Sequence, residues 1–94
     1  MREYKVLFKP SADRRLQKLP HDVQRRIVGA VAMLGHNPRP AGVVKLTGDE
    51  NLWRIRIGDY RVVYEIHEDR LIVLVLRVAH RKDAYRGGSP AATY

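Results

Sequence analysis

The fold is decided by one stretch of the chain, LWRIRIGDYRVVY at residues 52–64. It predicts two strands joined by a two-residue turn, because Gly58-Asp59 stands between two runs of alternating side chains. In such a hairpin Arg56 faces Arg61, and alternation along each strand places the apolar side chains on one face. These apolar residues are Trp53, Ile55, Ile57, Tyr60, Val62 and Tyr64. The opposite face carries three arginines.

The arginines of that second face, Arg54, Arg56 and Arg61, form the first candidate site. Like charges placed opposite each other destabilise a sheet, so a fold that gathers them favours a bound anion. Each guanidinium is always charged and offers two parallel hydrogen bonds to phosphate oxygens. The alternative is a solvated arginine face without a ligand, since antiparallel sheets commonly expose one polar face to water.

Length and composition limit the classes of protein that the sequence can encode. Its 94 residues make one small domain. A formal net charge of +8, from 18 Lys and Arg against 10 Asp and Glu, suits either a nucleic acid or an acidic protein partner. No apolar run approaches the roughly 20 residues of a membrane span, and no signal segment opens the chain. We therefore expect a cytoplasmic protein with no membrane contact.

Metal and paired-carboxylate chemistry are not indicated. The chain has no cysteine, which excludes disulfides and thiolate sites. Three of the histidines, His21, His36 and His67, show no ligand spacing with one another or with carboxylates. The carboxylates are scattered, and no pair suggests the machinery of a glycosidase. We expect neither a metal nor a cofactor.

Two helices are predicted between a first strand and the hairpin. Residues 3–8 alternate as a strand does, and Pro10 ends them. Ser11 is the expected N-cap of a short helix, and Pro20 fits the first turn of a second one. Apolar residues recur at helical spacing along this second helix; they are Val23, Ile27, Ala30, Val31 and Leu34. We expect the two helices to pack as a hairpin on one face of a sheet.

The C-terminal half supplies the rest of the sheet. A short strand is possible at 43–46, the hairpin extends over 52–66, and residues 71–76 are apolar at every position. Such a run indicates a strand covered on both faces in the middle of a sheet. The prediction is a compact α+β domain over 1–86, in which an N-terminal strand and a two-helix hairpin precede a mostly antiparallel three- to four-stranded sheet. Residues 87–94 should form a flexible C-terminal tail.

A second basic cluster, VAHRKDAYR at residues 78–86, follows the apolar strand. If the turn before that strand, at residues 68–69, also has two residues, Arg61 faces Leu76. The basic cluster then lies near the turn of the first hairpin, at the same end of the sheet as the arginines.

The residues of this cluster could act on RNA. Strict alternation places His80 on the arginine-bearing face, and Arg81 reaches it only if the strand has already ended. Clustered guanidiniums stabilise a phosphorane-like transition state, and the Tyr85 hydroxyl can orient or exchange a proton. RNA carries its own nucleophile, the 2′-hydroxyl, so no metal or protein nucleophile is required. The structural alternatives are that His80 only ends a strand and that Tyr85 only packs.

Taken together, these motifs resemble those of the RelE-type toxins of bacterial toxin–antitoxin systems, within the RelE/ParE superfamily. The similar segments are Lys45-Leu46 with Gly48, LWRIR at 52–56, DYRVVY at 59–64 and VAHRKDAY at 78–85. The opening strand and the Leu19-Pro20 junction also fit, so the resemblance covers residues 3–86. It implies a ribosome-dependent endoribonuclease that cuts mRNA in the decoding site and so inhibits translation.

The resemblance implies a role for each matching residue. Arg61 matches a phosphate-binding arginine, Arg81 a catalytic arginine and Tyr85 the catalytic tyrosine, and these three form the expected catalytic set. Arginine stands at two sheet positions that are often lysine in the family, which keeps the charge but leaves no group suited to proton transfer there. The expected RNA- and phosphate-binding residues are Arg54, Arg56, Lys45, His80 and Lys82.

The resemblance also implies a partner protein. A cognate antitoxin with an acidic, extended or helical segment would wrap the toxin in a hetero-oligomer and cover its arginines. The competing function is that of ParE-like members, which inhibit DNA gyrase without cleaving RNA and generally lack the full arginine–tyrosine set. A third possibility is an RNA-binding module without turnover, whose binding would survive the loss of Tyr85.

Overall fold

Seven elements follow one another in the computed structural model, which describes residues 3–46, 48 and 51–82. They are β1 (Lys5–Phe8), α1 (Pro10–Gln17), α2 (His21–Leu34), β2 (Val44–Lys45), β3 (Leu52–Ile57), β4 (Tyr60–His67) and β5 (Ile72–His80). Tyr85 and the tail predicted at 87–94 lie outside the described residues. No helix within the described ranges is long and apolar enough to cross a membrane.

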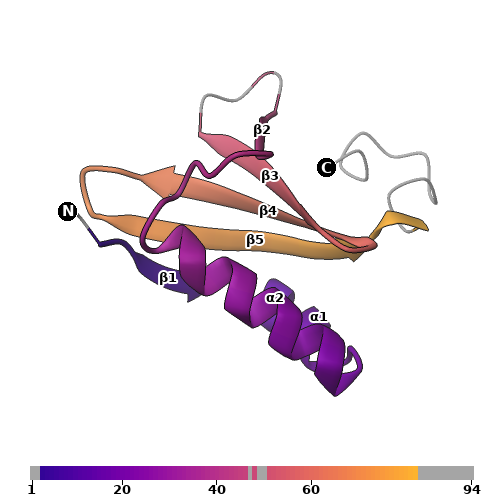
Figure 1. Cartoon of the computed structure of the whole chain (residues 1–94). Coiled ribbons are helices and arrows are strands. Elements are labelled where there is room, and N and C mark those ends of the chain that lie inside the picture. The colour runs from indigo at the N-terminus through magenta and orange to yellow at the C-terminus, as the bar shows by residue number, and fades with distance from the viewer. Residues whose placement is uncertain (1–2, 47, 49–50, 83–94) are drawn as a thin grey trace.

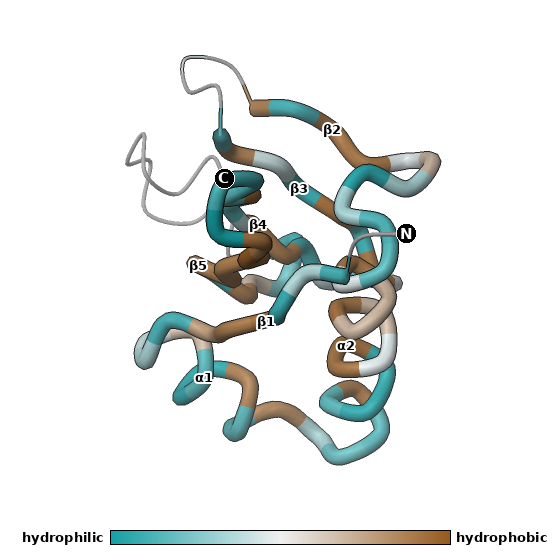
Figure 2. Tube along the Cα trace, turned by 90° about the vertical axis from the view of Figure 1, so that its left-hand side faces the viewer, coloured by the Kyte–Doolittle hydropathy of each residue, from teal (hydrophilic) through white to brown (hydrophobic). Residues whose placement is uncertain are grey.

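The strands form one sheet in the order β1-β5-β4-β3-β2 (Figure 1). β1 runs parallel to β5, and every other neighbouring pair is antiparallel. α2 lies against one face of the sheet, whereas α1 lies beside the edge of the sheet that β1 and β5 form (Figure 2). The predicted α+β fold with two helices and a mostly antiparallel sheet is confirmed, but the sheet has five strands instead of three or four, and β1 is its parallel edge strand.

The hairpin of β3 and β4 forms as predicted. Arg56 pairs with Arg61 and Ile57 with Tyr60, across the two-residue Gly58-Asp59 turn. Gly58 has a φ of 59°, the conformation that a type II′ turn needs at its first central residue. Glycine adopts this conformation without a Cβ clash, so the turn fixes the register of the two strands.

Prolines mark the start of both helices. α1 starts at Pro10 with Lys9 as its N-cap, so the prediction of Ser11 as the N-cap is wrong. Proline fits the first helical position because that position needs no N–H and its φ is already helical. α2 begins at His21, so Pro20 is its N-cap and lies one position before the predicted first turn. The helix ends before Gly35, where an added Cβ would lie 2.9 Å from the Tyr4 carbonyl oxygen. This glycine lets β1 approach the end of α2.

The core lies between α2 and one face of the sheet. The predicted apolar stripe of α2 is confirmed, since Ile27, Val31 and Leu34 are at most 1% exposed. They belong to one cluster with Tyr64, which is also fully buried. The Tyr64 hydroxyl donates a hydrogen bond of 2.6 Å to the Pro38 carbonyl oxygen, so its polar end is satisfied inside the core. Burial of apolar surface here is the main stabilising contribution.

The prediction that the apolar run at 71–76 is covered on both faces is wrong. β5 stands between β1 and β4, while β4 holds the middle of the sheet. Val73 and Val75 point into the core and are fully buried, but Leu74 and Leu76 are only half-buried. Leu7, the β1 partner of Leu74, is 39% exposed. Among the described residues only one face of β5 is covered by a helix layer.

Candidate functional site

An irregularity between β4 and β5 decides which side chains lie on the arginine-bearing face. His67 pairs with Ile72, so the turn between these strands spans 68–71 and has four residues instead of the predicted two. Further along, Tyr64 pairs with Val75 but Val63 pairs with Arg77. The extra residue on β5 is a β-bulge. Every side chain of β5 after it therefore lies on the face opposite to the one that strict alternation predicts.

Two predictions fail here, the pairing of Arg61 because of the longer turn together with the bulge, and the face of His80 because of the bulge. Arg61 pairs with Ala79, not with Leu76. His80 pairs with Tyr60 and therefore lies on the helix-covered face, not on the face of Arg61. The rings of His80 and Tyr60 meet edge to face, with their centroids 5.0 Å apart and their planes at 88°.

The bulge also adds a residue that sequence reasoning missed. Arg77 pairs with Val63, which pairs with Arg54 on its other side, so Arg77 lies on the arginine-bearing face. The sequence indicates this residue in one way only, as a single arginine after the apolar run of β5. A charged side chain is rarely fully buried, so such an arginine is expected on an accessible face. We call the surface formed by Arg54, Arg56, Arg61 and Arg77 the arginine face.

The arginine face consists of two neighbouring rows across the sheet. One row holds Arg56 and Arg61, and the next holds Arg54 and Arg77 on either side of Val63. Val63 is only 1% exposed. The long apolar stems of its arginine neighbours can cover it from both sides. Four guanidiniums are thus held on adjacent strands by a rigid sheet.

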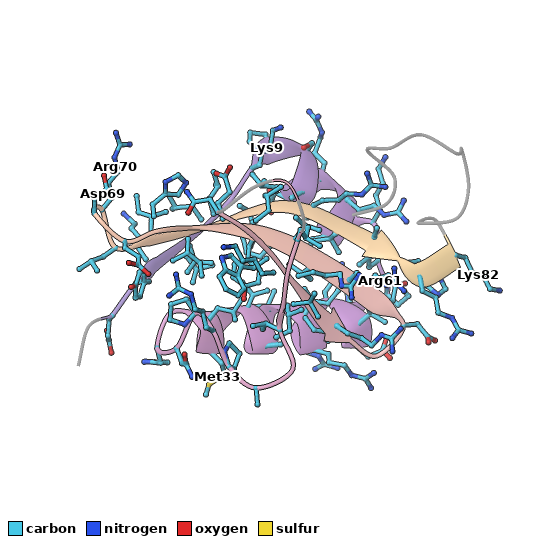
Figure 3. The ribbon with its side chains drawn as sticks, turned by 90° about the horizontal axis from the view of Figure 1, so that it is seen from above. Lys9, Met33, Arg61, Asp69, Arg70 and Lys82 are labelled. Atoms are coloured by element: carbon cyan, nitrogen blue, oxygen red, sulfur yellow. The ribbon has the colours of Figure 1, made fainter. Side chains whose placement is uncertain are left out.

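Arg81 stands at one end of this face. β5 ends at His80, and the backbone of Arg81 and Lys82 is helical. The Arg81 N–H donates to the Asp59 carbonyl oxygen over 2.7 Å, which places this residue beside the Gly58-Asp59 turn. Its Nε lies 3.8 Å from the Asp59 carboxylate, and both side chains are more than half exposed, so this ion pair is weak. Arg61 and Lys82 lie toward the same end of the molecule, and Asp69 and Arg70 at the other (Figure 3).

Lys45 does not join these residues. It pairs with Trp53 and therefore lies on the opposite face of the sheet. There it lines a hollow of about 390 Å³ together with Arg39 and Trp53. The Arg39 guanidinium lies 5.0 Å from the centre of the Trp53 ring and donates to the Glu68 carboxylate over 2.6 Å. These contacts brace the loop before β2 against the sheet.

Tyr64 is excluded as the proton-carrying tyrosine. Burial raises the pKa of Tyr64 to about 12, although the nearby Arg39 charge acts in the opposite direction. Its hydroxyl proton is donated to the Pro38 carbonyl oxygen inside the core. The predicted catalytic tyrosine, Tyr85, lies beyond the described residues.

A hollow of about 360 Å³ lies between α1 and the bulge in β5. Its lining includes Ser11, Ala12 and Arg15 from α1 and Val63, Leu76 and Arg77 from the sheet. It therefore continues the arginine face toward α1 with a largely apolar floor. Within the part of the chain that the structure describes, no three His, Asp or Glu side chains gather in a way that could hold a metal ion.

Comparison with known proteins gives a consistent result. The family model for the ParE toxin of a type II toxin–antitoxin system, parDE, matches residues 6–85. Toxin RelG of Mycobacterium tuberculosis is 34% identical over 84 residues, which are 88% of this chain and 97% of that toxin. Toxin RelE of the same organism is 36% identical and covers 88% of this chain and 87% of its own length.

Solved structures match equally well. A chain in the RelBE2 toxin–antitoxin complex of Mycobacterium tuberculosis has 33% identity and a TM-score of 0.75, over 88% of this chain and 97% of its own. A chain in the archaeal RelE–RelB complex of Pyrococcus horikoshii has 29% identity and the same TM-score, over 93% of this chain and 99% of its own length. The chain therefore belongs to the RelE/ParE family of toxins and is a RelE-type toxin of a toxin–antitoxin system.

Proposed function

We propose that this toxin is a ribosome-dependent endoribonuclease that cuts mRNA without a metal and so inhibits translation. The observation that supports this most strongly is the arginine face, on which four guanidiniums stand in two adjacent rows with Arg81 at their end. Arginine clusters of this kind bind phosphates bidentately and stabilise charge that develops on them. A toxin that acts on ribosome-bound mRNA works in the cytoplasm.

The proposed reaction uses the RNA as its own nucleophile. The 2′-oxygen loses its proton and bonds to the adjacent phosphorus, while the bond from phosphorus to the 5′-oxygen breaks and that oxygen takes up a proton. The products are a 2′,3′-cyclic phosphate and a 5′-hydroxyl, so the step needs neither water nor a redox partner. Arg61 and Arg81 stabilise the extra negative charge of the five-coordinate phosphorus. Tyr85 assists one of the two proton transfers.

The other basic residues hold the RNA chain. Arg54, Arg56 and Arg77 bind phosphates beside the scissile one, since they share the arginine face with Arg61. Lys82 extends this positive surface past the end of β5. Lys45 and His80 are left out of this contact because they lie on the opposite face of the sheet.

The alternative function is inhibition of DNA gyrase. It gains support from the name of the matching family model, which describes a ParE toxin. The nuclease is favoured by the combination of Arg61, Arg81 and Tyr85 in one chain and by relatives named RelE and RelG. Function follows the site and not the fold, so these residues carry more weight than the family description.

The partner that we propose is a cognate antitoxin in a hetero-oligomer. The similar solved toxins are components of toxin–antitoxin complexes. Here the arginine face adjoins an apolar surface made by the exposed Leu7 and the half-buried Leu74 and Leu76. A segment with acidic and apolar side chains would match both parts of this surface. Covering the arginines would block access of RNA and so neutralise the toxin.

Primer extension on a defined mRNA in a purified translation system tests the nuclease. We compare wild type with Arg81→Ala and Tyr85→Ala, and use Arg70→Ala as the matched control because Arg70 lies at the other end of the molecule (Figure 3). A reaction without ribosomes runs in parallel. We expect codon-phased cuts by wild type and by Arg70→Ala, which need ribosomes and disappear in the other two variants.

Intact mRNA with wild type would refute the nuclease and would lead to a gyrase supercoiling assay. Cuts that persist in Tyr85→Ala and Arg81→Ala would leave the reaction in place but assign it to other residues. RNA that binds the arginine face and is never cut would favour the binding module without turnover.

A further inference from the structure

His80 occupies the N-cap position of the helical turn that follows β5. The residues after it, Arg81 and Lys82, have helical backbone and stand at the first and second helical positions. The Lys82 backbone N–H donates a hydrogen bond of 3.1 Å to His80 Nδ1. An N-cap side chain satisfies the N–H of the second or third helical residue in this way. His80 Nδ1 therefore takes the role that an Asn, Asp or Ser oxygen usually has.

The imidazole that makes this cap is itself held in place. His80 is the last residue of β5 and pairs with Tyr60, the first residue of β4. The two rings meet edge to face at 5.0 Å, on the helix-covered side of the sheet. Tyr60 packs in turn against the core cluster. The cap is thus anchored in the core, on the side away from the arginine face.

Two consecutive hydrogen bonds fix the backbone on either side of the Arg81 side chain. The Arg81 N–H donates to the Asp59 carbonyl oxygen, and the Lys82 N–H donates to His80 Nδ1. The first bond ties the residue to the hairpin turn, and the second turns the chain from strand to helix. Without the second bond the backbone after His80 would be held on one side only, and the direction of the Arg81 side chain would be less well fixed.

We propose that His80 is a positioning residue that acts through Arg81. By capping the helical turn, it directs the Arg81 guanidinium to the end of the arginine face, where it can meet the same phosphate as Arg61. It neither contacts the phosphate nor transfers a proton. This inference rests on the proposed nuclease function, in which Arg81 stabilises charge on phosphorus.

Two substitutions separate capping from proton transfer. In His80→Asn the side-chain oxygen stands two bonds from Cβ, as Nδ1 does in histidine, and Asn is among the most favoured N-caps. It keeps the hydrogen bond to Lys82 but has no titrating ring. His80→Ala removes both. We expect the single-turnover cleavage rate on ribosomes to stay within about two-fold of wild type for His80→Asn and to fall roughly 3- to 30-fold for His80→Ala.

His36→Ala is the matched control, because His36 is an exposed histidine in the loop after α2. It should leave the rate and the pH–rate profile unchanged. The His80→Asn variant should also retain the wild-type pH–rate profile. If His80→Asn is as slow as His80→Ala and its pH–rate profile loses a limb, His80 transfers a proton and the positioning role is wrong.

A double-mutant cycle tests whether His80 acts through Arg81. In an Arg81→Ala background the further change His80→Ala should cost little, because the guanidinium that it positions is gone. Independent, multiplicative losses from the two substitutions would overturn the inference. Circular dichroism of each variant establishes that the fold persists.

Amide hydrogen exchange of Lys82 in the free toxin gives a readout that needs no RNA. Its amide should be protected in wild type and in His80→Asn and should exchange faster in His80→Ala. Equal protection in all three would overturn the cap, whatever the cleavage assay gives. If wild type fails to cut mRNA while this pattern holds, the nuclease proposal fails and the capping geometry stands.

Discussion

The two faces of the sheet are built by the same strands, yet they differ in almost every physical property. On the helix-covered face, the β4 residues Val62, Tyr64 and Ile66 are at most 2% exposed and make the core with α2. On the other face, the same strand presents Arg61, which pairs with Arg56 of β3. Alternation along one strand thus places the core residues that stabilise the fold on one face and the arginines available to a ligand on the other.

This separation has a physical cost on one side only. Like charges gathered on the arginine face repel one another, which destabilises the sheet. The helix-covered face supplies the apolar burial that offsets this repulsion. Stability and function should therefore respond independently to substitutions on the two faces.

The largest effect on stability is expected on the helix-covered face. Ile27 is fully buried, so Ile27→Ala should lower the free energy of unfolding by about 2–5 kcal/mol. The neighbouring Val28 is 47% exposed, and Val28→Ala serves as a matched control with a loss below about 1 kcal/mol. Urea denaturation measures both. Similar losses from the two variants would contradict the placement of the core.

The opposite result is expected on the arginine face. Arg61→Ala should slow cleavage of ribosome-bound mRNA roughly 10²- to 10³-fold, because it removes a charge that stabilises the transition state. Its free energy of unfolding should change far less than that of Ile27→Ala, since Arg61 lies outside the core cluster. Arg61→Lys should recover part of the rate. If Arg61→Ala loses activity only because it unfolds, the arginine face also stabilises the fold, and the separation of the two faces is wrong.

Tyr64 provides a pH-dependent test of the buried face. Its pKa is raised from 10.0 to about 12 by burial. Between these values the unfolded chain binds fewer protons than the native one, so stability falls as pH rises, by up to about 2–3 kcal/mol. Tyr64→Phe has no hydroxyl that can titrate, so its stability lacks this fall with pH. The difference in unfolding free energy between wild type and Tyr64→Phe should therefore shrink from pH 10 to pH 12, and a constant difference would contradict the burial of the hydroxyl.

The smallest predicted effect concerns Arg77. Arg77→Ala should weaken binding of a short single-stranded RNA and reduce the slope of log affinity against log salt by about 0.7, the value for one lost phosphate contact. Fluorescence anisotropy at several salt concentrations measures this slope. Arg70→Ala is the control, as Arg70 lies at the other end of the molecule (Figure 3). If both variants change the slope alike, the arginine face has no special role in RNA binding.

The two hairpins show how far sequence reasoning reaches. Between β3 and β4 a glycine at a two-residue turn fixes every pair, so the prediction of Arg54, Arg56 and Arg61 on one face is confirmed. Between β4 and β5 the turn is longer and a bulge shifts the register. An uninterrupted apolar run carries no alternation from which either face of β5 could be recognised.

The consequences of that bulge explain which site residues were assigned correctly. Strict alternation predicts the wrong face for His80 and does not indicate Arg77 as a site residue, because both lie beyond the bulge. Lys45 was grouped with the arginines through the resemblance alone, and pairing with Trp53 puts it on the other face. Arg81 reaches the arginine face because the bulge places Arg77 and Ala79 there, and Arg81 follows Ala79 by two residues beside the hairpin turn. The catalytic roles of Arg61, Arg81 and Tyr85 stay predictions.

The central claim is that the arginine face cleaves RNA while the opposite face only holds the fold. Its most direct test is the single-turnover cleavage of one ribosome-bound mRNA by Arg61→Ala and Arg70→Ala, two toxins with the same net charge and an intact core. We predict wild-type cleavage by Arg70→Ala and almost none by Arg61→Ala. Equal rates from the two variants would contradict the claim, because net positive charge and not the arginine face would then account for the activity.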